Sequence, residues 1–186
     1  MPSPEYLGFL DRGLQSEQMV AHYIATRHRC EVMRSGHAKT RVGDAEQAPL
    51  LLAFGVQIIA PDMLTWNKGM PLWVEVKDKD SCTWHRKSNR WQTGLNARHL
   101  RAYQQVMERT KIDVCVWFIH HGVGRDDDPI DLCQPQGVFT GRISALSSKA
   151  REHGGMVYWD MALLTEQCSL EALLSMRNVT MMKQRA

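Results

Sequence analysis

Asp62, Glu75 and Lys77 are the residues of this sequence whose types and spacing could do chemistry together. Asp62 follows Pro61, and twelve residues separate it from the triplet Glu75-Val76-Lys77. Two carboxylates that meet at one point form a hard-oxygen site suited to Mg2+ or Mn2+, and such an ion lowers the pKa of bound water. A lysine beside them can orient the attacking water and stabilise negative charge on a phosphate. The combination is suited to hydrolysis of a phosphodiester bond.

The residues around the two acids predict a pair of strands joined by a tight turn. Residues 56–64 are rich in β-branched and apolar types, residues 67–69 are typical of a turn, and residues 71–77 alternate. Alternate residues of a strand share a face, so Glu75 and Lys77 point the same way with Trp73. The opposite face takes the apolar residues Leu72, Val74 and Val76.

The position of the turn predicts which residues face each other. If the turn is symmetric about Lys68 and Gly69, Asp62 lies opposite Glu75, whereas a bulge at Gly69 would shift the register by one residue. Opposed residues have Cβ atoms about 5 Å apart, and like charges at that distance destabilise a sheet. A proton, the Lys77 ammonium or a divalent cation would each compensate. The alternative is an ordinary surface hairpin that holds no ion.

The order Pro61-Asp62 followed by Glu75-Val76-Lys77 resembles the signature of the PD-(D/E)XK nuclease superfamily. That superfamily includes many restriction enzymes, RecB-like exonucleases and archaeal-type Holliday-junction resolvases. The resemblance implies an α/β fold with a central mixed β-sheet flanked by helices, a restriction-endonuclease-like core in the order α-β-β-β-α-β. It also implies a Mg2+ or Mn2+ ion held by Asp62, Glu75 and the backbone carbonyl of Val76, with Lys77 as a catalytic residue.

Glu17 is a further candidate for the site. Residues 13–29 have helical periodicity with an apolar stripe at Val20, Tyr23 and Ile24, and Glu17 points from the same face. An acid on an inward face needs a partner. The segment Arg12-Gly13 to Glu17 resembles the opening helix of resolvase and RecB-like nucleases, whose early glutamate reaches the metal, directly or through water. Alternatively, Glu17 is a half-exposed acid that the helix dipole favours.

His99 and Tyr103 are accessory candidates on a second helix. Asn96 is a suitable N-cap for residues 97–110, where Leu100, Tyr103 and Met107 form an apolar stripe. His99 and Tyr103 lie four residues apart and share a side of the helix. They resemble the Gln-x-x-x-Tyr element of RecB-like nucleases, with His99 replacing the glutamine. An amphipathic helix with a tyrosine at its packing margin is the alternative.

Positive charge is concentrated directly after the proposed site. Residues 77–111 hold nine Lys or Arg and three Asp or Glu, a balance of +6, whereas the rest of the chain carries 14 against 17, a balance of −3. An enzyme that acts on a polyanion needs cations there, although a basic solvated loop is the alternative. Aromatic rings can stack on bases or anchor a loop, and both interpretations stay open. The expected contacts to nucleic acid come from residues 35–49 and the loop 78–94 and its flank: Lys39, Arg41, Trp84, Arg86, Lys87, Arg90, Trp91 and Arg98.

The remaining elements are predicted by patterning and caps. Strands are expected at residues 30–34, 113–120, 138–143 and 156–159, and the segment 50–54 is a short strand or helix that interrupts the core as an insertion. Helices are expected at residues 144–152, at 161–167 capped by Asp160, and at 170–176 capped by Ser169. Residues 122–137 are acidic and predict a loop.

The length of 186 residues fits a single nuclease domain, with an N-terminal arm at 1–12, a catalytic core at 13–121 and an extension of the same domain at 122–186. No apolar run is long enough for a membrane span, and the N-terminus lacks the pattern of a signal peptide. Five irregularly spaced cysteines indicate reduced thiols. We therefore expect a soluble cytoplasmic protein with no membrane partner and no small-molecule cofactor.

These patterns together predict a Mg2+-dependent DNA endonuclease that is structure-selective in recombination or repair, like a Holliday-junction resolvase. A restriction-type or transposon-end nuclease is one alternative, and a nucleic-acid-binding module without catalysis is another. The apolar residues of the last helix would fit a homodimer, although packing within the chain explains them more simply.

Overall fold

Six of the strands that the structure describes form the main sheet of the molecule. The computed structural model describes residues 4–35, 50–53, 56–126, 128–129 and 132–183. The strand order is β1-β4-β5-β8-β9-β12, with β5 and β8 parallel and the other neighbours antiparallel. This mixed sheet confirms the predicted fold class. Its strands are β1 (Glu31–Arg34), β4 (Met63–Asn67), β5 (Met70–Lys79), β8 (Val114–His121), β9 (Gln136–Arg142) and β12 (Thr165–Cys168).

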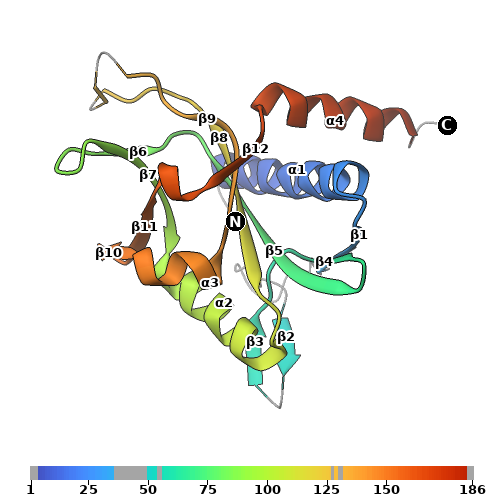
Figure 1. The fold of residues 1–186 in the computed structure, drawn as a ribbon. Coiled ribbons are helices and arrows are strands. Elements are labelled where there is room, and N and C mark those ends of the chain that lie inside the picture. Colours follow the sequence, from blue (N-terminus) through green and yellow to red (C-terminus); the bar gives the residue numbers. More distant parts are fainter. Residues whose placement is uncertain (1–3, 36–49, 54–55, 127, 130–131, 184–186) are drawn as a thin grey trace.

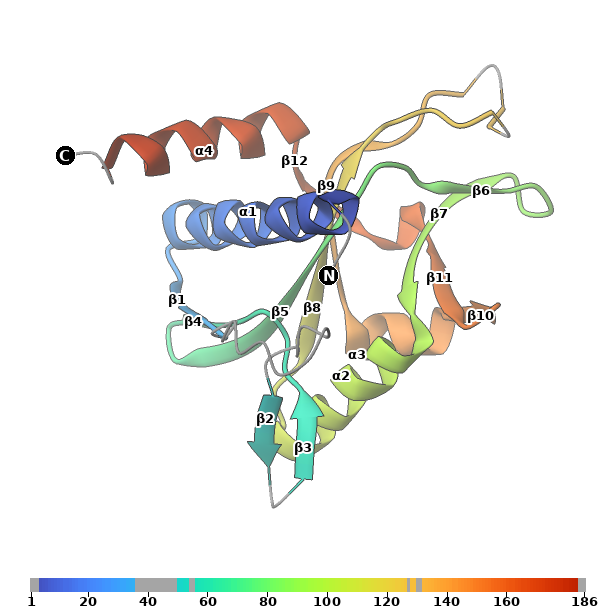
Figure 2. The ribbon, with the colours of Figure 1, turned by 180° about the vertical axis from the view of Figure 1, so that it is seen from behind.

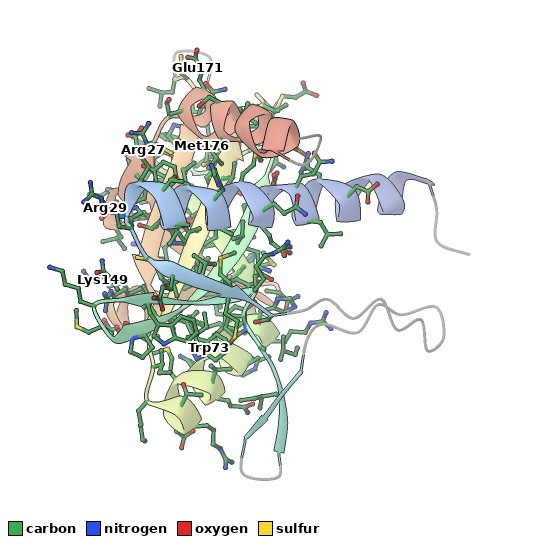
Figure 3. All side chains as sticks on the ribbon, turned by 90° about the vertical axis from the view of Figure 1, so that its right-hand side faces the viewer. Arg27, Arg29, Trp73, Lys149, Glu171 and Met176 are labelled. Carbon is green, nitrogen blue, oxygen red and sulfur yellow. The ribbon has the colours of Figure 1, made fainter. Side chains whose placement is uncertain are left out.

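Helices cover both faces of this sheet (Figures 1 and 2). The helices α1 (Pro4–Arg27) and α4 (Leu170–Lys183) lie side by side on one face, while α2 (Ala97–Thr110) and the short α3 (Ile143–Leu146) lie on the other. Alternation along β5 therefore fills two cores. Val74 and Val76 pack under α1, whereas Trp73 packs with α2 (Figure 3).

Two hairpins are inserted into the predicted core. The order α1-β1-β4-β5-α2-β8 is the expected α-β-β-β-α-β, and the hairpin β2 (Leu50–Ala53) and β3 (Val56–Ile59) precedes β4. The second hairpin, β6 (Thr83–His85) and β7 (Arg90–Asn96), lies between β5 and α2. It joins β10 (Arg151–His153) and β11 (Met156–Asp160) in a four-stranded sheet of order β10-β11-β7-β6. The 3-10 turns are η1 (Ser147–Lys149) and η2 (Met161–Leu163).

The register of the β4–β5 hairpin is the predicted one. Lys68 and Gly69 both have positive φ, 50° and 79°, as a two-residue turn that matches strand twist requires. Asn67 pairs with Met70, and Met63 pairs with Val74. The β4–β5 pairing contains no bulge, so the register continues from the last pair toward Asp62 and Glu75.

Two expected boundaries were wrong in the first half of the chain. The arm expected at residues 1–12 is largely helix, because α1 already begins at Pro4, and proline suits a first helical position whose N–H has no partner. Gly8 and Gly13 obscured the periodicity. The strand expected at residues 56–64 is split between β3 and β4. Pro61 has no N–H for a ladder, so pairing stops there.

The expected loop at residues 78–94 is instead the end of β5 and the β6–β7 hairpin. The helix expected at 161–167 is the turn η2 followed by strand β12, and Asp160 makes no cap but accepts a hydrogen bond from Gln92 Nε2 at 2.7 Å. The helix expected at 144–152 ends early, as α3 and η1. Tertiary pairing overrode local propensity in each case.

The last helix confirms its predicted cap. The Ser169 hydroxyl accepts a hydrogen bond from the Ala172 N–H at 3.2 Å. Leu170 and Leu173 are buried against α1 and the sheet, so packing within the chain accounts for them. In the part of the chain that the structure describes, no helix is both long and apolar enough to cross a membrane.

Candidate active site

Asp62 lies just before β4, and Glu75 lies in the middle of β5. Asp62 lies one residue beyond the pair Met63 and Val74, where the continuing register faces Glu75. The Asp62 Oδ2 accepts a hydrogen bond from the Val76 N–H at 2.7 Å. Asp62 is 9% exposed and Glu75 is 3% exposed. The two strands therefore hold two nearly buried carboxylates at one place.

Lys77 is paired with Glu75 through its ammonium group. Alternation places both side chains on the same face of β5, and 26% of the Lys77 side chain remains exposed. Burial lowers the pKa of Lys77, but the carboxylates of Glu75 and Asp62 outweigh this effect, so that its pKa is raised. Lys77 thus carries its positive charge next to the acids.

The Asp62 carboxyl has a pKa well above its usual value. Burial is the largest cause, and the negative charges of Glu75 and Glu17 add to it, while Lys77 and the Val76 N–H oppose it. Carboxylates that disfavour each other's ionised form are relieved by a cation. Binding of a proton or a metal ion would therefore relieve the repulsion between the carboxylates.

The donor set fits a magnesium site with few protein ligands. Among the described residues, no group of three or more His, Cys, Asp or Glu side chains is arranged to hold a metal ion. Mg2+ usually keeps several waters and uses one or two carboxylates together with substrate phosphates. Asp62 and Glu75 meet that requirement, whereas a closed structural site would need more ligands.

Glu17 reaches the same region from α1. It is 8% exposed, and its Oε2 lies 3.2 Å from Nη2 of Arg34 on β1. Burial and the charge of Glu75 raise the pKa of Asp62, and the charge of Glu17 adds to them. The inward-facing acid thus has a cationic partner and is electrostatically part of the site.

Tyr103 and His99 approach Glu75 from α2. Asn96 caps this helix by accepting a hydrogen bond from the Arg98 N–H at 2.9 Å. The Tyr103 hydroxyl is 3.4 Å from His99 Nδ1. Burial, the charge of Glu75 and a hydrogen bond to that carboxylate raise the pKa of Tyr103. Burial and Lys77 lower the pKa of His99, so its imidazole is neutral beside the phenol.

The sequence analysis missed a group of residues around Asp78. Asp78 Oδ1 lies 3.1 Å from Nε of Arg12 and 2.9 Å from Nε2 of His121, and Asp78 Oδ2 accepts a hydrogen bond from the Ser16 hydroxyl. The Asp78 side chain is 7% exposed. These contacts fasten α1, which carries Glu17, to the strand that carries Glu75. The only sequence signal was the spacing of Arg12 and Ser16, one helical turn apart.

The expected nucleic-acid contacts lie mostly on the surface. Lys39 and Arg41 are outside the described residues. The side chains of Arg86, Lys87 and Arg98 are exposed. Trp84 and Trp91 are half-buried and pair with each other across the β6–β7 hairpin.

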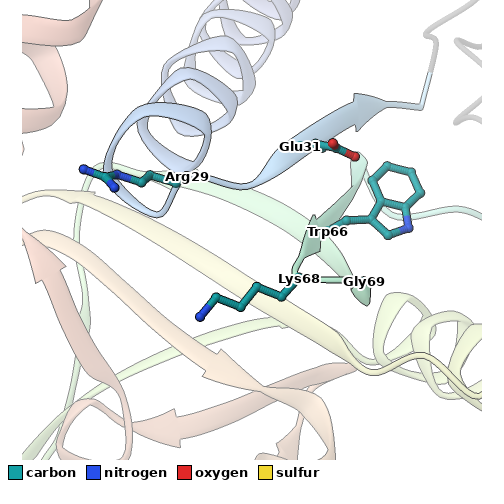
Figure 4. A pocket seen from close by; sticks show the side chains of 5 residues that line it. All are labelled: Arg29, Glu31, Trp66, Lys68 and Gly69. Atoms are coloured by element: carbon teal, nitrogen blue, oxygen red, sulfur yellow. The ribbon is translucent and has the colours of Figure 1, made fainter.

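Two surface cavities lie apart from the acids. One, of about 320 Å³, surrounds the β4–β5 turn and is lined by Arg29, Glu31, Trp66, Lys68 and Gly69 (Figure 4). The other, of about 570 Å³, lies in the segment between β8 and β9. Neither Asp62 nor Glu75 lines either cavity.

Comparison with known proteins gives the fold. No protein-family model and no curated protein matches the sequence. Among solved structures, Hjc, a Holliday junction resolvase from the archaeal hyperthermophile Archaeoglobus fulgidus, aligns with a TM-score of 0.50 at 11% identity. The alignment covers 83% of this chain and 95% of Hjc. The chain has the resolvase fold. D212, a nuclease from a fusselovirus, aligns over 97% of this chain and 96% of its own at 11% identity, with a TM-score of 0.38.

Proposed function

We propose that this protein is a Mg2+-dependent DNA endonuclease. The observation that carries the proposal is the convergence of Asp62, Glu75 and Lys77, two nearly buried carboxylates and an ammonium, on a sheet with the resolvase fold. Fold likeness alone does not set function. The site adds charge and geometry that suit a phosphate substrate.

Asp62, Glu75 and the Val76 carbonyl would hold the metal, with Glu17 contributing through water. A bound Mg2+ neutralises phosphate charge and lowers the pKa of a coordinated water. The Val76 N–H orients Asp62 by its hydrogen bond. Tyr103, on α2, hydrogen-bonds to the Glu75 carboxylate and so helps to position it.

Lys77 stabilises charge during the reaction. Its raised pKa keeps it protonated, so it serves as a cation and a hydrogen-bond donor rather than as a base. A preorganised ammonium at the phosphate stabilises the negative charge that grows in the transition state. It also orients the attacking water.

The likeness to Hjc supports a structure-selective role in recombination or repair. Supercoiled, linear and four-way-junction DNA would be incubated with the purified protein, with Mg2+ or with EDTA. We expect cleavage of the junction with Mg2+ and none with EDTA. Cleavage of all three substrates at one rate would contradict the structure selectivity, and binding without cleavage would contradict the nuclease.

The assignment of the acids is tested by isosteric substitution. Asp62→Asn and Glu75→Gln should each lower the cleavage rate by about 100-fold or more, because each removes a metal ligand. DNA binding should persist. Glu152→Gln, at an exposed position of β10, is the matched control and should cleave as the parent does. Full activity in Asp62→Asn would refute the site.

A further inference from the structure

The β6–β7 hairpin carries a run of positive charge that no acid interrupts. Residues 81–107 contain no Asp or Glu. At the tip, Arg86, Lys87 and Arg90 are exposed, and the hairpin projects from the body of the molecule (Figure 2). Arg90 lies 3.5 Å from Asp160, but its side chain is 59% exposed, so the pairing leaves its charge accessible. β7 pairs with β11 from Gln92 onward, so the outer part of the projection, residues 84–91, is a basic two-stranded ribbon.

The ribbon is held rigid by its own side chains. Trp84 and Trp91 form a cross-strand pair with ring centroids 5.0 Å apart and an interplanar angle of 66°, an edge-to-face packing. At the tip, His85 Nδ1 is hydrogen-bonded to the Ser88 hydroxyl at 2.7 Å. The two tryptophans are therefore occupied with each other, which favours anchoring over stacking on bases.

The base of the ribbon is fixed to the strands that carry the site. Cys82 Sγ and Thr93 Oγ1 lie 3.4 and 3.0 Å from the two ring nitrogens of His120, which is fully buried on β8. Residues 80–82 connect β6 to the strand β5, which carries Glu75 and Lys77. The contacts with His120 thus fix the orientation of the ribbon relative to the acids.

The neighbouring projection has the opposite charge. The Cys82 N–H donates to Gln134 Oε1 at 2.8 Å, and Gln134 Nε2 donates to the Cys82 carbonyl at 3.2 Å, so the segment after β8 lies beside the ribbon. This segment carries Asp126 and Asp128. A phosphate backbone is therefore repelled there and attracted to the β6–β7 ribbon.

We propose that the β6–β7 hairpin enters a groove of duplex DNA and pairs with the phosphates that border it, away from the bond that is cut. The inference rests on the proposed function and names its substrate as a duplex arm. The major groove, about 12 Å wide, admits a two-stranded β-ribbon. Arg86, Lys87 and Arg90 supply the cations that neutralise the adjoining phosphates.

Binding to a short labelled duplex of arbitrary sequence and to its labelled single strand tests this directly. Fluorescence anisotropy would be measured with Mg2+ in the Glu75→Gln background, so that the DNA is not cut. Arg86→Ser combined with Lys87→Ser should weaken duplex binding by about 10- to 100-fold and reduce the magnitude of the salt slope by about 1.8, since two phosphate contacts are lost. Single-strand binding should change less.

Arg109→Ser combined with Lys149→Ser is the matched control, because it removes two exposed cations outside the hairpin. It should bind duplex DNA nearly as the background does. Equal losses in the two double variants, or equal losses on duplex and single strand, would overturn the inference. Circular dichroism melting verifies that each variant is folded.

The two proposals fail separately. If the wild-type protein cleaves DNA and the hairpin variant binds duplex like its background, the nuclease proposal holds and the proposed role of the hairpin is wrong. If the wild-type protein does not cleave and duplex binding still depends on Arg86 and Lys87, the hairpin proposal holds and the nuclease proposal is wrong. Absence of duplex binding by the Glu75→Gln background contradicts the proposed role of the hairpin. Cleavage by the wild-type protein is measured separately and tests the nuclease proposal.

Discussion

Lys77 shows how neighbouring charges set the role of a residue. Burial alone would favour a neutral amine, which could act as a base. The carboxylates of Glu75 and Asp62 reverse that tendency and raise the pKa of Lys77. Burial, together with the charges of Glu75 and Glu17, raises the pKa of Asp62. The chemistry thus divides, with the carboxylates suited to a metal ion and the ammonium suited to developing negative charge.

Replacing Lys77 by methionine should therefore slow cleavage by about 100- to 10,000-fold while leaving DNA binding nearly intact. The loss is in the transition state, because the ammonium acts on charge that develops there. Single-turnover cleavage rates and anisotropy titrations separate the two effects. Lys149→Met, at an exposed position, is the control and should cleave normally. A Lys77→Met variant with parental rates would exclude this role.

Tyr103→Phe tests the contact between α2 and Glu75. The change removes only the hydroxyl that hydrogen-bonds to Glu75 and His99. We expect cleavage to slow by about tenfold and the free energy of unfolding to fall by about 1 kcal/mol, the usual contribution of one hydrogen bond. Plasmid nicking rates and urea unfolding measure both. An unchanged rate would mean that Tyr103 serves packing alone.

The site residues differ in how far sequence could predict them. Glu75 and Lys77 lie within one alternating strand, so their common face follows from local pattern. Asp78 has partners on α1 and at the end of β8, and a strand pattern gives no information about contacts between segments so far apart in the chain. The role of Asp78 can be recognised only from the packing of α1 against the sheet.

At the scale of elements, α1 is fastened to the sheet by Asp78. Asp78→Ala removes the acceptor for Arg12, Ser16 and His121 and should lower the free energy of unfolding by about 2–3 kcal/mol. Asp80→Ala is the matched control. Asp80 is 51% exposed and pairs with Arg12 at 2.6 Å, so its loss should cost at most about 1 kcal/mol. Chemical denaturation of both variants decides, and equal losses would contradict the anchoring role.

The elements that sequence predicted well are those with complete local signals. The helix α2 has an N-cap at Asn96 and a left-handed C-cap at Lys111, and β8 is an apolar run. The β6–β7 hairpin was interpreted as a loop because its residues are polar or aromatic with no clear alternation. Its second strand, β7, pairs with β11, whose residues lie far along the chain.

At the scale of the whole molecule, His120 joins the main sheet to the smaller one. Burial, with the charges of Lys79 and His121, lowers the pKa of His120 from 6.5 to about 4. Between these two pKa values the unfolded state binds a proton at His120 and the folded state does not. The contribution of the neutral His120 to stability is therefore present above pH 6.5 and is lost as the pH falls toward 4. The loss at low pH amounts to about 3 kcal/mol.

Unfolding free energies of the parent and of His120→Gln, measured across this pH range, test the linkage. The parent should lose more stability than the variant as the pH falls, since glutamine does not titrate. Comparison of the two proteins cancels the titration of the carboxylates that both contain. Parallel curves for parent and variant would contradict the buried neutral imidazole.

The two-residue turn at Lys68 and Gly69 also limits how this chain can change in length. Adding a single amino acid there would shift the register of one strand by one residue. The side chain of Asp62 would then point to the face of the sheet opposite Glu75. Adding two would restore the match. Insertions and deletions between the acids should therefore be tolerated in even numbers.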